Sequence, residues 1–87
     1  MEISYDQMTI EELNNEKEIL LKEIDRLNEE IEDNNKLMND KYIHYLDKRE
    51  YENENIYNRL RISNLYSMID DINTSISNRV VRKLSNS

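Results

Sequence analysis

The 87-residue chain has no glycine, proline or cysteine, and it also lacks alanine, phenylalanine and tryptophan. Glycine and proline are the usual residues of tight turns and helix ends, so their absence favours long uninterrupted helices over several short elements. Without cysteine the chain can form neither a disulfide nor a thiolate metal site, which fits a reducing compartment. The expected fold class is therefore all-α.

Long apolar runs are also missing, and the mean hydropathy is −0.97. No segment approaches the roughly twenty apolar residues that cross a bilayer, and the N-terminus has no signal-peptide core. We therefore expect a soluble protein that is cytoplasmic or virion-associated and has no membrane partner.

Groups that could support catalysis are scarce. His44 is the only histidine, no glycine-rich phosphate loop exists, and Asp70 and Asp71 lack the spacing of a calcium loop. The many carboxylates recur at positions that would face solvent on a helix. We expect no enzymatic activity, no cofactor and no metal site, and we interpret His44 as a surface side chain.

The N-terminal third contains a regular apolar pattern. Its apolar residues recur in steps of three and four, as in a coiled coil, and only Lys17 interrupts the series. Thr9 and Glu12 have the spacing of a capping box, and Met8 can form a hydrophobic staple with Leu13. We predict an acidic coiled-coil helix over residues 9–33. Its interface residues, the first seam, are Ile10, Leu13, Leu20, Ile24, Leu27 and Ile31, with Leu21 beside them.

The ends of the chain carry weaker signals. Residues 1–8 are expected to form an extended or frayed arm, or alternatively an extra helical turn capped by Ser4 with Gln7, or a segment that docks into a partner. Residues 85–87 are expected to be a frayed tail.

The pattern weakens between the two halves of the chain. Asn34 occupies a position where an apolar residue is due, and residues 34–40 are rich in Asn and Asp, which prefer caps and turns. Either the helix continues with a polar layer and a stutter, or it breaks here and reverses into a hairpin. Continuation is the favoured interpretation, because no glycine or proline marks a stop and Leu37 and Met38 resume the apolar face.

A second helical segment is predicted over residues 41–84. In residues 41–60 a looser and wetter contact is expected along Tyr42, Tyr45, Leu46, Ile56 and Leu60, with Arg49 and Asn53 between them. Tyr51, Tyr57 and Tyr66 lie off this line, as amphipathic surface side chains or as interface anchors. Regular steps then return in the second seam, which comprises Ile62, Leu65, Ile69, Ile72, Ile76 and Val80.

Acidic and basic residues are distributed unevenly between the two halves of the chain. Residues 1–40 hold thirteen acidic and four basic side chains, whereas residues 41–87 hold six acidic and eight basic ones. In an antiparallel coiled coil, equivalent flanks of the two seams face each other. We therefore expect the first seam to pack antiparallel on the second, between chains or within one chain. The flank residues that would pair are Glu16, Glu23 and Glu30 with Arg61 and Arg82.

These patterns predict long coiled-coil helices that self-associate in an antiparallel bundle, or alternatively a compact helical hairpin or three-helix bundle. A short chain rarely buries enough apolar surface alone, so we expect a homo-oligomer or a complex with another helical protein. The function favoured is structural: oligomerisation, scaffolding or connection. The residue bias suggests an AT-rich genome of a bacterium, phage or virus.

Two other functions compete with the structural one. The acidic half could make the chain an inhibitor or adaptor that covers a basic surface of a nucleic-acid-acting protein. Direct nucleic-acid binding through Arg79, Arg82 and Lys83 is less expected, because three cations on an acidic chain give a weak electrostatic footprint.

Overall fold

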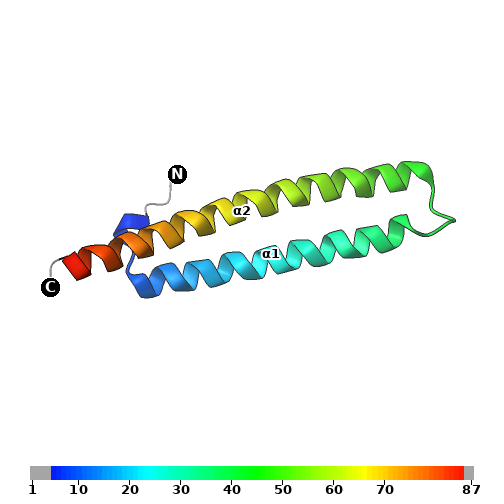
Figure 1. Cartoon of the computed structure of the whole chain (residues 1–87). Helices are drawn as coiled ribbons and strands as arrows, with labels where there is room; N and C mark the ends of the chain where they lie inside the picture. Colours follow the sequence, from blue (N-terminus) through cyan, green and yellow to red (C-terminus); the bar gives the residue numbers. More distant parts are fainter. Residues whose placement is uncertain (1–4, 86–87) are drawn as a thin grey trace.

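The computed structural model describes residues 5–85, which form two long helices and one short turn. The turn η1 is a 3₁₀ helix at Tyr5–Gln7, α1 spans Ile10–Met38, and α2 spans Tyr45–Ser85. The two helices run antiparallel beside each other as a hairpin (Figure 1). Its extents of 66 × 22 × 16 Å describe a rod. The predicted all-α class with antiparallel helix pairing is confirmed.

Helix α1 begins at the predicted capping box. The Glu12 amide donates a 3.1 Å hydrogen bond to the Thr9 hydroxyl, and the Thr9 amide donates one of 3.2 Å to the Glu12 carboxylate. The two bonds satisfy amides that the first helical turn leaves without backbone partners. Glu11 and Glu12 also place negative charge at the positive end of the helix dipole.

The two predicted seams pack on each other within one chain. Leu13 and Ile72 are completely shielded from solvent, and burial of each such side chain contributes about 1.5–3 kcal/mol. Partly buried side chains, including Met8, Ile62 and Ile76, border this core. The buried apolar residues are Leu13, Leu20, Ile24 and Leu27 of α1 and Leu65, Ile69 and Ile72 of α2.

The expectation of one continuous helix through residues 34–40 is wrong, because the chain reverses at residues 39–44. Asn39 ends α1 with φ −82° and ψ −5°. The Asp40 carboxylate then accepts a 3.0 Å hydrogen bond from the Tyr42 amide, and the Asp40 carbonyl accepts one of 3.1 Å from Ile43. This side-chain turn needs no glycine, since no residue in the described part of the chain has positive φ.

The start of α2 is organised by His44. Its imidazole Nδ1 accepts a 3.2 Å hydrogen bond from the Leu46 amide, and its carbonyl accepts one of 3.0 Å from Lys48. His44 is exposed, as expected. His44 also caps the start of α2, a role beyond the expected surface side chain.

The N-terminal segment folds back onto the far end of α2. The Arg79 guanidinium donates hydrogen bonds to the carbonyl oxygens of Met8 and Tyr5, the latter at 2.6 Å. We call this arrangement the Arg79 clamp. The expectation of an extended arm is therefore wrong for residues 5–8. The alternative of an extra helical turn is present there as η1, whereas its predicted cap at Ser4 lies outside the described residues. Residues 86–87 of the expected tail also lie outside them.

Candidate interaction surface

Near the connection between the two helices, residues 39–44, side-chain amides make the contact between α1 and α2. The Asn34 side chain donates a 2.9 Å hydrogen bond to Asn55, whose own amide donates one of 3.0 Å to Asn35. One turn further along α2, Asn58 donates a 3.2 Å hydrogen bond to the Glu30 carboxylate. Asn55 is only 1% exposed, so its polar groups depend on these protein partners.

The predicted contact line of residues 41–60 does not face α1 within the hairpin, and a contact of this line with another chain stays a prediction. Asn55 and Asn58 face α1, whereas Arg49 and Asn53 are exposed. Five apolar residues predicted to line the contact are instead between 54% and 84% exposed. They are Tyr42, Tyr45, Leu46, Ile56 and Leu60.

The orientation of α2 follows from the second seam. Counting back from Ile62 in the same steps of four and three reaches Asn58, Asn55 and Tyr51. Asn58 and Asn55 are buried and Tyr51 is half-buried. The periodicity of the second seam thus extends to the face of α2 that contacts α1, but asparagines occupy it there, so a pattern of apolar residues does not reveal it.

An exposed line therefore runs along the side of α2 that faces away from α1. We call it the outer stripe, and it is bordered by the exposed side chains of Tyr45 and Tyr57. Its spacing of three, four, three and four residues keeps its members on one side of a helix. The outer stripe consists of Leu46, Arg49, Asn53, Ile56 and Leu60.

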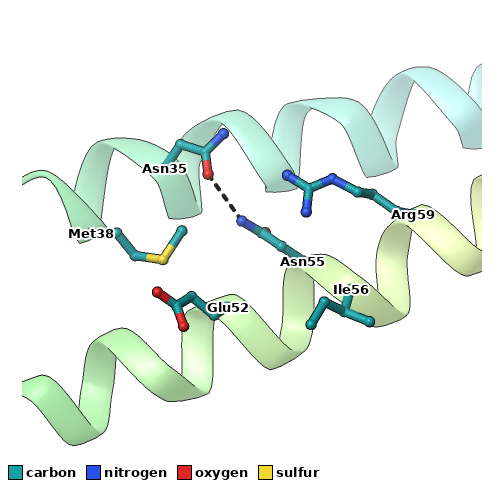
Figure 2. A pocket seen from close by; sticks show the side chains of 6 residues that line it. All are labelled: Asn35, Met38, Glu52, Asn55, Ile56 and Arg59. Carbon is teal, nitrogen blue, oxygen red and sulfur yellow. Dashed lines mark hydrogen bonds between the residues drawn. The ribbon is translucent and has the colours of Figure 1, made fainter.

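A shallow groove adjoins the outer stripe. It has a volume of about 290 Å³ and lies between the end of α1 and the facing turn of α2. Figure 2 shows the Asn35–Asn55 hydrogen bond crossing it, with Met38 and Arg59 on either side. Glu52 and Ile56 complete its lining. The groove thus combines apolar, amide and charged groups without a cluster specialised for one chemistry.

One side of the hairpin carries the charged flank. Glu23 and Arg61 approach to 3.7 Å across the two helices. Within α1, Arg26 contacts both Glu23 and Glu30 at 2.6 Å. The Arg26 hydrogen bond, aided by the charges of Arg26 and Arg61, lowers the pKa of the Glu23 carboxyl below its usual 4.5.

Of the other proposed flank residues, Glu30 pairs with Arg26 of its own helix, and no ion pair within residues 5–85 includes Glu16 or Arg82. Glu16 is half-buried, and its charge, with that of Asp71, adds to burial in raising the pKa of Tyr5. Arg82 is exposed, and Arg79, three residues earlier, makes the clamp instead.

The predicted interface residues divide into three groups by burial. Seven are buried in the intramolecular core described above, while Ile31, Ile62 and Ile76 are half-buried. Ile10, Leu21 and Val80 remain exposed along its edges. Their assignment to an interface between chains stays a prediction.

No protein family, no curated protein and no solved structure matches this chain. Within residues 5–85, no three His, Asp or Glu side chains gather in a group that could hold a metal ion. Over the same residues, neither helix is both long and apolar enough to span a membrane.

Proposed function

We propose that this chain is a non-enzymatic, self-associating coiled-coil hairpin that serves as an oligomerisation, scaffolding or connector element. The observation that carries this proposal is the outer stripe. The two seams already satisfy each other within one chain, yet α2 retains exposed leucine and isoleucine side chains in coiled-coil spacing. Such a face, bordered by tyrosines, is typical of a protein interaction surface.

The rod shape supports the same proposal. An antiparallel hairpin 66 Å long can separate or join partners while presenting one long side to each of them. The residue bias towards Asn, Ile, Lys, Glu and Tyr would fit a component of a phage, viral or low-GC bacterial assembly, located in the cytoplasm or the virion.

Sedimentation equilibrium of the 10.6 kDa chain, over a wide concentration range and at low and high salt, tests the proposal. We expect a defined oligomer that forms as concentration rises. Because the exposed contact is mainly apolar, salt should weaken it little. A monomer at all concentrations would contradict self-association.

A second candidate is an acidic adaptor or inhibitor that binds a basic protein surface. It is favoured by the outer side of α1, where Glu11, Glu18 and Glu29 are exposed. This function predicts binding to a basic protein that weakens steeply with salt, because exposed charges are screened within about 10 Å at 0.1 M ionic strength.

A further inference from the structure

The residue types of the outer stripe between Leu46 and Ile56 are symmetric about Tyr51. The first four residues of the outer stripe are apolar, polar, polar and apolar in turn. They are Leu46, Arg49, Asn53 and Ile56. Residues 46 and 56, and residues 49 and 53, are equidistant from Tyr51. Reversing the direction of the helix about this point therefore places apolar on apolar and polar on polar.

We propose that the outer stripe binds the same stripe of a second copy in antiparallel orientation, with a two-fold axis at the level of Tyr51. The inference rests on the proposed self-association and specifies its surface. In this register Leu46 lies opposite Ile56 of the second copy, and Arg49 lies opposite Asn53 of the second copy. Leu60 lies level with the connection of the second copy, which carries the exposed Tyr42.

Charge selects the antiparallel orientation. A parallel pair would match the apolar residues equally well, but it would bring Arg49 against Arg49 in the middle of the contact. In the antiparallel pair Arg49 is displaced from Glu52 of the second copy by one residue, or about 1.5 Å along the axis. Both charges are repeated by symmetry, so each arginine acquires a carboxylate neighbour.

The same register gives the bordering side chains partners. Tyr45 and Arg59 lie on one border of the outer stripe, and two-fold symmetry brings them within two residues of each other across the contact. An arginine over a tyrosine ring adds a favourable interaction when partly desolvated. The exposed acidic side of α1 remains outside this contact, where it keeps its solvation.

The stripe from Leu46 to Leu60 is about 21 Å long at 1.5 Å per residue. A contact of this length between single helices is small compared with that of a permanent dimer. We therefore expect a reversible dimer that dissociates in the micromolar to millimolar range.

The test compares two isoleucines that are equally exposed in the hairpin. Ile56 is 62% exposed on the outer stripe, and Ile19 is 60% exposed on α1 away from it. Sedimentation equilibrium of the full chain should show that Ile56→Glu weakens dimerisation at least about tenfold, while Ile19→Glu leaves it unchanged. Circular dichroism of both variants should retain the helical spectrum, because neither side chain belongs to the core.

Disulfide trapping determines the orientation, and the natural chain has no cysteine to interfere. Leu46→Cys and Ile56→Cys should each fail to cross-link alone, because identical positions would lie about 15 Å apart along the axis. A mixture of the two variants should form the mixed disulfide.

Each outcome bears on a distinct statement. If Ile56→Glu and Ile19→Glu associate as well as the natural chain, the outer stripe is not the contact, although self-association stands. If each single-cysteine variant cross-links to itself, the antiparallel register is wrong. If the natural chain is monomeric throughout, the proposed function itself fails.

Discussion

Ser75 carries a buried hydroxyl group that has no hydrogen-bond partner among residues 5–85. Such a group loses its hydration on folding and gains nothing in return, which costs about 1–3 kcal/mol. Its neighbour Ser77 is exposed on the same helix and keeps its contact with water. Replacing each serine by alanine therefore separates the effect of the buried hydroxyl on stability from the effect of helix propensity.

Ser75→Ala is expected to stabilise the hairpin by about 1–2 kcal/mol, because it removes the unpaired hydroxyl and raises helix propensity. Ser77→Ala should gain only the propensity contribution of about 0.5 kcal/mol. Urea unfolding monitored by circular dichroism measures both. Equal stabilisation of the two variants would show that the Ser75 hydroxyl is satisfied.

Tyr5 is expected to make the free energy of unfolding depend on pH in the alkaline range. Burial and the charges of Glu16 and Asp71 raise its pKa above 10.0, so the folded chain holds the phenolic proton more tightly than the unfolded chain. This contribution is complete below the unfolded pKa and is lost as pH rises through the folded pKa. Stability should therefore fall above about pH 10, and Tyr5→Phe should reduce that fall.

Urea unfolding of the natural chain and Tyr5→Phe at several pH values between about 9 and 11 checks this expectation. The two proteins differ only at residue 5, so the difference between the two curves reports Tyr5. Parallel pH profiles would contradict the described packing of the N-terminal segment.

At the scale of the element, each helix was predictable to the extent that its buried face is apolar. The first seam and the Thr9 cap could be recognised because both depend on residues within one helix. The reversal at Asn39 and Asp40 was missed because it uses side-chain hydrogen bonds in place of glycine. The Arg79 clamp was also missed, since it joins residues more than seventy positions apart.

The orientation of α2 near the connection rests on Asn55. Asn55→Ala leaves the buried Asn34 amide without its partner, which should destabilise the hairpin by about 1–3 kcal/mol. Asn53→Ala, two residues away on the outer stripe, should be neutral or slightly stabilising because alanine favours helix.

Chemical denaturation of the two variants decides which asparagine faces α1. A larger loss of stability for Asn53→Ala than for Asn55→Ala would show that the line through Asn53 faces α1. The two variants are a matched pair, since each replaces an asparagine within α2 by alanine.

At the scale of the whole molecule, charge favours the antiparallel pairing. Glu16, Glu23 and Glu30 share the side of α1 that carries the Glu23–Arg61 contact. Reversing all three to lysine should lower the unfolding temperature, because Arg26 and Arg61 would then face like charges. Raising the salt concentration should recover part of the loss.

The matched control reverses Glu18, Asp25 and Glu29 to lysine, three residues on the exposed outer side of α1 away from its first turn. It changes the net charge equally but places no lysine beside α2. We therefore expect a smaller fall in the unfolding temperature. If the two triple variants melt alike, net charge rather than the paired flank governs stability.

The pairing of the first and second seams within a single chain holds the hairpin together. It is tested most directly by spin labels on Glu11→Cys and Asn78→Cys, two exposed positions beside the Arg79 clamp. The doubly labelled chain is diluted with excess unlabelled chain and the electron–electron distance is measured. The hairpin predicts a distance below about 30 Å that persists on dilution. A distance near 100 Å, the length of a continuous helix between these positions, or loss of the short distance on dilution would contradict it.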